Sequence, residues 1–340
     1  MILPYTPDHR TLWDRTIDES RNGTFLLHRS YMDYHRERFE DASLLWQDQR
    51  GRTLGLFPAC WHPRLPKTIV SHAGLTYGGC VLSPRIGLVQ VGEMLREILA
   101  HYKQQGAETL IIKPIPQIYA TLPAEEELYW INRLGGRLTA RSASQTVALQ
   151  EEGVGFSTLR RRKVKRAEGE GCCIVDDTKL DDLPAFWQIL GETLRCRHQV
   201  APVHTLEEIR RLIRDNAPHI RLFTIRQGNQ LVAGTLLFEM NPVVHAQYIA
   251  ASSAGRELGA LDFLFHHLIE RYRQQDFRFL DFGISTEDGG QVLNEGLTFQ
   301  KEGFGGRTIC YDAYTIPILC QSAFLSFPRS LAKFLHASTL

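Results

Sequence analysis

The sequence predicts a mixed α/β protein made of two similar halves, each with a mixed β-sheet flanked by helices. The composition is that of a globular protein, with 43% hydrophobic and 23% charged residues. A length of 340 residues is enough for two domains, each with a hydrophobic core. The third observation is a repeated order of predicted elements, because helix, hairpin, strand, helix and strand occur in each half.

Hydrophobic periodicity and turn residues define the elements of the first half, which we expect at residues 1–150. Its hairpin turns at Gln49-Arg-Gly-Arg52, and Pro114 ends its last strand. The predicted elements are a helix at 30–39, hairpin strands at 43–47 and 53–60, extended segments within 69–82, a helix at 88–104 and a strand at 108–113.

The second half is expected at residues 172–315 and repeats this order. A turn at Gln227-Gly-Asn229 joins its hairpin strands, and a loop that contains glycine precedes its last helix. The predicted elements are helices at 182–195 and 206–216, hairpin strands at 220–226 and 230–239, a strand at 243–250, a helix at 259–274 and a strand at 277–283.

Residues 151–171 are expected to connect the two halves, and they contain a nearly unbroken run of cations. One interpretation is a solvated helix face whose few apolar residues dock on one domain. The other is a contact with the phosphates of a nucleotide-bearing donor or acceptor. The cations are Arg160, Arg161, Arg162, Lys163, Lys165 and Arg166.

The overall charge argues against a general affinity for polyanions. Lys and Arg number 39 against 38 Asp and Glu, a formal net charge of +1, so no global field favours DNA or an anionic membrane. The first residues lack the apolar core of a secretory signal, and no apolar run reaches the ~18 residues of a membrane helix. We therefore expect a cytoplasmic protein without a DNA partner. The seven cysteines include no C-x-x-C pair, so no metal site is predicted.

Residues 316–340 form a predicted amphipathic tail, in which apolar side chains are mixed with Arg329, Lys333 and His336. We expect this tail to pack against the body of the protein. The alternative is peripheral contact with the inner membrane surface, near a lipid-linked acceptor.

Three motifs occur in the order in which one known family has them. The stretch Leu159-Arg-Arg-Arg-Lys-Val-Lys-Arg-Ala-Glu-Gly-Glu-Gly171 is similar to a basic segment K-x-R-x-x-I-R-K-A-x-x-x-G, and Asp281-Phe-Gly283 is similar to a strand end D-F-G-G. The stretch Gly296-Leu-Thr-Phe-Gln-Lys301-Glu-Gly-Phe-Gly305-Gly306 is similar to G-L-x-x-F-K-x-G-F-G-G, with Gln300 replacing an aromatic residue. The chain therefore resembles the FemAB-like family, which has two GNAT-type acyltransferase domains in tandem.

The resemblance implies an N-acyltransferase but leaves its donor and acceptor open. Members use either aminoacyl-tRNA, to extend peptidoglycan bridges, or acyl-CoA. The absence of a long charged heptad segment favours acetyl-CoA. Further stretches resemble tandem acyltransferases of surface-polysaccharide synthesis, which implies the amino group of a sugar nucleotide or a related precursor as acceptor. A catalytically silent module that binds a nucleotide-linked ligand is a third alternative. These stretches are residues 71–79, 260–265 and 282–287.

The resemblance also implies a cofactor site where the strand at 243–250 feeds a loop that opens a helix. GNAT acetyltransferases bind the acyl-CoA pyrophosphate on backbone N–H groups at this helix start, where the N–H groups are unpaired. The usual pattern is R/Q-x-x-G-x-G/A, and here Leu261 stands at the last small position. We therefore expect cofactor contacts at Gly255, Arg256, Gly259 and Ala260.

Acyl transfer to an amine needs a base and a donor for the developing oxyanion. His245 lies on the strand at 243–250 and has a suitable intrinsic pKa near ~6.5. Asp281 ends an apolar strand, where a carboxylate needs partners, and is expected to act as base or to orient His245. Lys301 is the expected oxyanion donor, with a surface ion pair to Glu302 or Glu295 as the alternative. Glu239 is a weaker candidate for the base.

Acceptor contacts are expected in both halves. His72 and Tyr77 lie in a glycine-rich segment that could let backbone approach a ligand, and they are expected to form a wall of a cleft between the domains. Glu287 and Asn294 lie in a polar, glycine-rich loop, and Arg307 follows the closing motif, so we expect all three to face the substrate.

Overall fold

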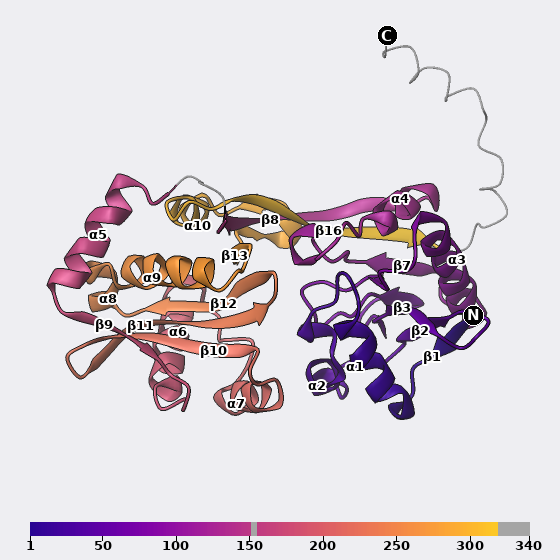
Figure 1. Cartoon of the computed structure of the whole chain (residues 1–340), viewed down its shortest axis with the longest axis horizontal. Coiled ribbons are helices and arrows are strands. Elements are labelled where there is room, and N and C mark those ends of the chain that lie inside the picture. Colours follow the sequence, from indigo (N-terminus) through magenta and orange to yellow (C-terminus); the bar gives the residue numbers. More distant parts are fainter. Residues whose placement is uncertain (151–154, 319–340) are drawn as a thin grey trace, which may run out of the picture.

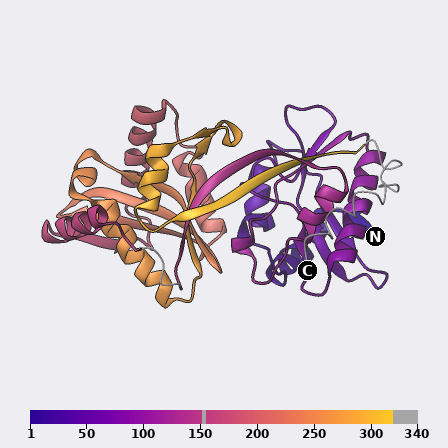
Figure 2. The same cartoon turned by 90° about the horizontal axis from the view of Figure 1, so that it is seen from above.

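The computed structural model describes residues 1–150 and 155–318. Two halves lie side by side and are bridged along one edge by two long strands, β8 and β16 (Figure 1). Viewed from above, these strands run from one half into the other (Figure 2). The mixed α/β class predicted from the sequence is confirmed.

The first half contains more short strands than its sequence pattern indicated. Its elements are β1 (Ile2–Pro4), α1 (Arg10–Asp18), α2 (Arg29–Met32), β2 (Leu44–Gln47), β3 (Thr53–Phe57), β4 (Cys60–Trp61), β5 (Thr68–Val70), β6 (Val81–Leu82), α3 (Leu88–Gln104), β7 (Thr109–Ile112), the short 3₁₀ helix η4 (Gln117–Tyr119), α4 (Glu126–Arg133) and β8 (Arg137–Ala148).

The second half follows the predicted order more closely. Its elements are α5 (Thr158–Gly169), β9 (Cys172–Asp176), α6 (Leu183–His198), α7 (Leu206–Asp215), β10 (Ile220–Gln227), β11 (Gln230–Met240), β12 (Val243–Ala251), α8 (Ser253–Leu258), α9 (Ala260–Gln274), β13 (Phe279–Ile284), β14 (Thr286–Glu287), β15 (Val292–Leu293), α10 (Glu295–Glu302) and β16 (Arg307–Pro317).

One sheet runs through both halves, whereas the sequence predicted a separate sheet for each. Its strand order is β4-β5-β7-β16-β8-β13-β12-β11-β10-β9. The strand β16 pairs with β8 along most of its length, and its last residues pair with β7 of the first half. The strand β8 pairs in turn with β13 of the second half. A four-stranded sheet, β1-β2-β3-β6, completes the first half.

The hydrophobic cores explain why the halves stay together. One cluster contains Phe25 and Tyr31 of the first half and Phe238 of the second, with ring centroids 5.3 Å and 6.0 Å from that of Phe238. Two further clusters fill the space between the sheet and α9 and between the first half's strands and α3. Burial of aromatic side chains across the boundary stabilises one fixed arrangement of the halves.

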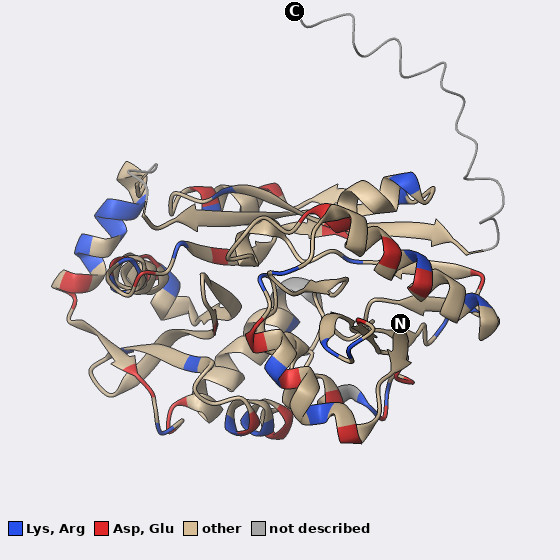
Figure 3. Ribbon diagram, turned by 45° about the vertical axis from the view of Figure 1, so that its right-hand side comes forward, with Lys and Arg blue, Asp and Glu red and all other residues tan. Residues whose placement is uncertain are grey.

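The basic segment predicted as a connector forms α5, which packs against α9. Ser157 caps the helix by accepting the Arg160 N–H, and Val164 and Ala167 are its buried apolar residues. The remaining cations of the run lie mostly on its exposed side, at the upper left of Figure 3. The structure of this segment agrees with the first interpretation, a solvated helix face whose few apolar residues dock on one domain.

Several expectations need correction. The predicted helix at 30–39 is limited to α2 and a following 3₁₀ turn, and the preceding helix α1 was missed. The predicted loop at 251–258 contains the short helix α8, which Ser252 caps. The strand β8 was not predicted, although polar and apolar residues alternate at its start, from Arg137 to Ala140. The tail at 316–340 lies almost wholly outside the described residues; its first two residues end β16.

Candidate active site

The candidate site lies where two parallel strands separate. The strands β12 and β13 pair from Val243 opposite Phe279 to His245 opposite Asp281. Beyond that position β12 continues to Ala251, and no further pairing with β13 follows. Parallel strands that stop pairing leave a gap in the sheet, with unpaired backbone groups on both sides.

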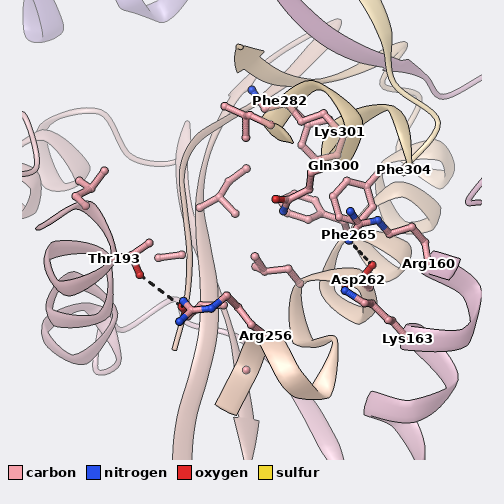
Figure 4. Close-up of a pocket in the computed structure, with 17 residues that line it drawn as sticks. Arg160, Lys163, Thr193, Arg256, Asp262, Phe265, Phe282, Gln300, Lys301 and Phe304 are labelled. Atoms are coloured by element: carbon pink, nitrogen blue, oxygen red, sulfur yellow. Dashed lines mark hydrogen bonds and ion pairs between the residues drawn. The ribbon is translucent and has the colours of Figure 1, made fainter. Parts of the chain in front are cut away.

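A cavity of about 370 Å³ opens at this gap, mostly on the α9 side, and reaches α6 on the other face of the sheet at Thr193 and Leu194 (Figure 4). In Figure 4, Phe282 and Lys301 lie at one side of the cavity and Lys163 and Arg256 at the other. The walls combine aromatic and aliphatic side chains with a few cations, which is typical of a ligand site. The lining residues are Arg160, Lys163, Thr193, Leu194, Ile249, Ala250, Ala251, Gly255, Arg256, Leu261, Asp262, Phe265, Phe282, Leu297, Gln300, Lys301 and Phe304.

Four cations line the cavity, and three of them, Arg160, Lys163 and Arg256, differ in their surroundings. Arg160 is buried and donates to Asp262 Oδ1 at 2.8 Å, so its charge is balanced inside the protein. Arg256 donates to the Ala251 carbonyl at 2.7 Å. Within the described part of the chain, Lys163 and Arg256 form no ion pair, which leaves two positive charges available to an anionic ligand.

The four predicted cofactor contacts divide into two groups. Gly255 and Arg256 line the cavity, whereas Gly259 and Ala260 lie buried at the junction of α8 and α9. Gly259 has a φ of +78°, and a Cβ there would lie 2.7 Å from Cβ of Lys163. The glycine is therefore needed for the turn and for close packing of α5.

Asp281 is the centre of a buried hydrogen-bond network. Its side chain is fully buried and accepts hydrogen bonds from Ser144 Oγ at 2.5 Å, Thr146 Oγ1 at 2.9 Å and Tyr311 OH at 2.8 Å. His245 Nδ1 lies 2.8 Å from its Oδ2. Burial alone would raise the pKa of Asp281, but the hydrogen bonds and the charge of His245 lower it to about 2.

This network separates the two roles that the sequence left open for Asp281. A carboxylate with so low a pKa and with both oxygens occupied cannot take a proton from a substrate near neutral pH. It can hold the Nδ1–H tautomer of His245, so that Nε2 becomes the free acceptor. The arrangement favours orientation of His245 over direct base catalysis by Asp281.

Glycine at position 283 leaves space beside the imidazole. A Cβ built on Gly283 would lie 3.4 Å from Cε1 of His245, and the residue has a φ of +75°. A side chain at this position would be strained and would cover the edge of the imidazole ring. The motif Asp281-Phe-Gly283 thus supplies a carboxylate for one edge of the imidazole and clearance for the other.

Lys301 is buried, with only 4% of its surface exposed, which contradicts the predicted alternative of a surface ion pair. Its Nζ donates to the carbonyl oxygens of Gly283 and Ile284 at 2.7 Å and 2.9 Å. An ammonium has three N–H donors, so one remains for the cavity that Lys301 lines. Burial lowers its pKa to about 8, and the charge of Asp281 partly opposes this shift.

Strand register aligns four polar residues across the sheet. His245 lies opposite Asp281, Asp281 opposite Thr146, and Thr146 opposite Arg307. Residues paired directly opposite one another share a face of the sheet. Arg307, which is exposed, therefore lies on the same face as the His245 and Asp281 pair.

Glu287 and Asn294 are brought together at the surface. Asn294 Nδ2 donates to Glu287 Oε1 at 3.2 Å, and Asn294 Oδ1 caps α10 by accepting the Leu297 N–H. Asn294 thus has a structural role, because α10 carries Lys301.

Glu239, the weaker candidate for the base, accepts a hydrogen bond from Tyr272 OH at 2.6 Å and takes no part in the Asp281 network.

The predicted cleft wall in the first half is a buried packing region. The hydroxyl of Tyr77 lies 3.1 Å from Thr24 Oγ1 and 3.4 Å from Met240 Sδ, so Tyr77 joins the two halves. His72 is also buried and packs its ring against Phe39. The sequence placed both residues beside a ligand, whereas the structure surrounds them with protein.

Comparison of the two halves explains this difference. The strands β5 and β7 pair in parallel up to Val70 opposite Ile111, as β12 and β13 do. The segment that follows β5 then folds back, and Gly78 N donates to the Lys113 carbonyl at the end of β7. A Cβ on Gly78 would lie 2.3 Å from the Ser71 carbonyl oxygen. The glycines allow the chain to approach itself here, in the place where the second half has its cavity.

Sequence reasoning missed most of the Asp281 partners. All four partners are far from Asp281 in sequence. The pairing of β8, β13 and β16 brings Ser144, Thr146 and Tyr311 close, and Tyr119 comes from η4. Residues 142–147, Ser-Ala-Ser-Gln-Thr-Val, contain no alternation of polar and apolar residues that would have placed them on a strand. Among the described residues, no group of three or more His, Cys, Asp or Glu side chains could hold a metal ion.

A protein-family comparison identifies the domain that contains this site. Residues 157–289 match the model of the acetyltransferase (GNAT) domain. The protein therefore contains a GNAT-type acyltransferase domain. The match begins at α5, so the basic helix belongs to the GNAT domain. No curated protein matches the sequence at a significant level.

Solved structures resemble the acyltransferase over nearly its whole length. A FemX structure has a TM-score of 0.68 and 12% identity, with 93% of this chain and 97% of that chain covered. An L-PGS from Bacillus licheniformis has a TM-score of 0.59 and 12% identity, with 94% of each chain covered. The C-terminal domain of a putative lysylphosphatidylglycerol synthetase from Agrobacterium fabrum has a TM-score of 0.58 and 12% identity, with 91% and 92% covered.

These similarities are at the level of the fold. They confirm the FemAB-like tandem architecture that the three motifs predicted. None of the helices in the described part of the acyltransferase has the length and apolar character needed to cross a membrane.

Proposed function

We propose that this acyltransferase transfers an acetyl group from acetyl-CoA to the amino group of a sugar nucleotide or a related precursor of cell-surface polysaccharide. One observation carries the proposal: the gap between β12 and β13 opens into a cavity that lies mostly on its α9 side, and the His245–Asp281 pair lies on its other side. We propose a cytoplasmic site of action, where acyl-CoA is formed.

The two faces of the sheet give donor and acceptor separate approaches. Phe282 belongs to the core under α9 and lines the cavity, whereas its neighbour Asp281 points to the opposite face because side chains alternate along a strand. A thioester in the cavity would present its carbonyl carbon at the gap. An amine from the other face would meet that carbon beside His245.

The cavity suits the phosphopantetheine arm and the phosphates of CoA. Its inner wall is apolar, with Phe265, Phe282 and Phe304, and its other side carries the cations Lys163 and Arg256. An apolar wall accepts the uncharged arm, and the cations would pair with the pyrophosphate. Leu261, the departure from the usual glycine-rich pattern, lines this cavity.

His245 would act as the base. Its Nε2 takes a proton from the acceptor ammonium, directly or through water, while Asp281 holds Nδ1–H. The neutral amine then attacks the thioester carbon, forming the C–N bond and an oxyanion. His245 has by then released the first proton to solvent, so it can take the second proton, which the attacking nitrogen loses. As the oxyanion collapses, the C–S bond breaks, and the CoA thiolate leaves and takes this second proton from His245.

Lys301 would stabilise the oxyanion with its third N–H group. Two carbonyl oxygens fix the position of Nζ, so little reorganisation is needed when the negative charge develops. A single well-placed donor lowers the barrier to acyl transfer by about 3 to 4 kcal/mol.

Arg307 and Glu287 would bind the acceptor. Arg307 is exposed on the face of His245 and would bind a phosphate of the acceptor, and Glu287, in the neighbouring β14–β15 hairpin, would face its sugar.

An aminoacyl-tRNA-dependent peptidoglycan transferase is the second candidate. The FemX-like fold and the exposed cations of α5 favour it, because a basic helix can bind a phosphate backbone. The two donors are distinguished by thermal unfolding of the purified protein with acetyl-CoA or aminoacyl-tRNA, since a ligand raises Tm only if it binds the folded state.

Hydrogen exchange tests the donor site directly. Saturating acetyl-CoA should protect amides of α8 and of the start of α9 from exchange. Protection should be lost in Arg256→Ala, whereas Arg273→Ala, at the other end of α9, should retain it. Unchanged exchange in α8 at saturation would contradict the donor assignment.

A further inference from the structure

A chain of hydroxyl groups connects the first half of the molecule to Asp281. Tyr311 OH donates to Asp281 Oδ2 at 2.8 Å, and Tyr119 OH lies 2.8 Å from Tyr311 OH. Tyr119 belongs to η4, in the first half, and its own distance to Asp281 Oδ2 is 3.4 Å. Both tyrosines are buried, with 1% and 9% of their surfaces exposed.

The number of available O–H donors fixes the direction of the hydrogen bonds between the two tyrosines and Asp281. A phenol has one O–H to donate, and that of Tyr311 is used on the carboxylate. The short contact between the hydroxyls therefore has Tyr119 as donor and Tyr311 as acceptor. Burial and the neighbouring charge of Asp281 raise the pKa of Tyr311 well above its ordinary value, so its hydroxyl remains a donor at all working pH values.

We propose that Tyr311 and Tyr119 are positioning residues, which fix the Asp281 carboxylate and limit how strongly it polarises His245. This inference rests on the proposed role of His245 as base. It assigns to the first half a part in the chemistry of the second, because Tyr119, Ser144 and Thr146 all come from the first half and all contact Asp281.

The physical argument concerns shared charge on Asp281 Oδ2. This oxygen accepts from Tyr311 and from His245 at the same distance of 2.8 Å, so the two donors compete for its negative charge. A hydrogen bond from Tyr119 makes Tyr311 a stronger donor, because linked hydrogen bonds polarise one another. Removing either hydroxyl leaves more negative charge for the imidazole, which stabilises its protonated form and raises its pKa.

The other described groups around Asp281 and His245 do not change their charge in the pH range where a histidine titrates. Ser144 and Thr146 are neutral donors from β8, and burial raises the pKa of Tyr77 above its ordinary value. Lys301 on α10 loses its proton only around pH 8. A difference in the titration of His245 between the wild type and the tyrosine variants can therefore be assigned to the loss of a tyrosine hydroxyl.

The test is an NMR titration of protein labelled with ¹³C at histidine Cε1, with His245→Gln used to assign the signal. The measurement requires neither the acyl donor nor the amine substrate. Tyr311→Phe should raise the pKa of His245 by about 0.5 to 1 unit, the effect of one hydrogen bond. Tyr119→Phe, one step removed, should raise it by a smaller amount. The matched control is Tyr314→Phe on the same strand, whose hydroxyl donates to Asp312 at 2.9 Å.

A pKa of His245 unchanged in both Tyr311→Phe and Tyr119→Phe, or shifted equally in Tyr314→Phe, overturns the inference. If Tyr311→Phe does not fold, the sign of the shift in Tyr119→Phe decides. The failure of this inference and the failure of the proposed function can be told apart. An inactive His245→Gln with unshifted tyrosine variants would reject only the positioning role, and an active His245→Gln with shifted variants would reject only the base.

Discussion

His245 Nδ1 lies 2.8 Å from Asp281 Oδ2 at the last paired position of two parallel strands. The pairing aligns the two side chains on one face of the sheet, and the separation of the strands just beyond it opens the cavity. The same point in the fold therefore orients the candidate base and gives access to the donor. In the first half, the corresponding position is closed by the segment after β5.

His245→Gln should lower the rate of acetyl transfer from acetyl-CoA to a UDP-linked amino sugar by ~10²-fold or more, because glutamine cannot accept the amine proton. The rate is measured by release of the CoA thiol. His267→Gln, at an exposed position of α9, is the control and should retain the normal rate. Near-normal activity of His245→Gln would remove His245 from the mechanism.

Asp281→Asn should lower both the rate and the stability. An amide would present N–H groups to donors that now point at a carboxylate, which leaves buried donors unpaired at a cost of about 3 kcal/mol or more. The rate loss should persist at temperatures where circular dichroism shows the variant to be folded. A folded variant with a normal rate would contradict the orienting role of Asp281.

Acid should destabilise the wild type through Asp281. Its pKa is lowered from 3.8 to about 2 by folding, so the ionised group contributes stability above about pH 4, and this contribution is lost as the pH falls towards 2. Urea unfolding at several pH values should show a steeper loss over this range in the wild type than in Asp281→Asn. Parallel curves would show that Asp281 is not ionised in the folded protein.

Lys301→Met should reduce the catalytic rate by ~10² to 10³ while donor affinity stays nearly unchanged, because its ammonium acts only when the oxyanion forms. In the wild type, the rate should fall as the pH rises past about 8, where Lys301 loses its proton. Lys103→Met, at an exposed position of α3, is the control. Equal loss of donor affinity and rate would instead give Lys301 a binding role.

Gly259→Ala should weaken acetyl-CoA binding and lower Tm. The residue has a φ of +78°, and its new Cβ would lie 2.7 Å from Lys163, so α5 and the cavity wall must move. Gly228→Ala is the control that has backbone strain without a new contact, because Gly228 has a φ of +57° and no atom lies within 4 Å of the added Cβ. The control should lose only about 1 kcal/mol of stability and bind normally. If Gly228→Ala weakened acetyl-CoA binding as much as Gly259→Ala, displacement of α5 would be excluded as the cause of the weaker binding.

The second half was predicted well because its elements are long and strongly patterned. The strand β11 and the helix α9 are continuous stretches whose period or length distinguishes them locally. The first half has strands of only two or three residues at β4, β5 and β6, too short for periodicity to define. The helix α1 was missed for a related reason, because only three of its residues are buried.

By itself, the sequence determined the fold class, the family, and the placement of His245, Asp281 and Lys301 as candidates, since these follow from local pattern and motif. The tertiary structure alone decided what each residue contacts. Lys301 is buried because α10 packs over the end of β13, and Asp281 is held by donors that β8 and β16 bring from distant parts of the chain. Strand pairing depends on long-range register, which no local pattern encodes, so the shared network of the two halves appears only when the chain is folded.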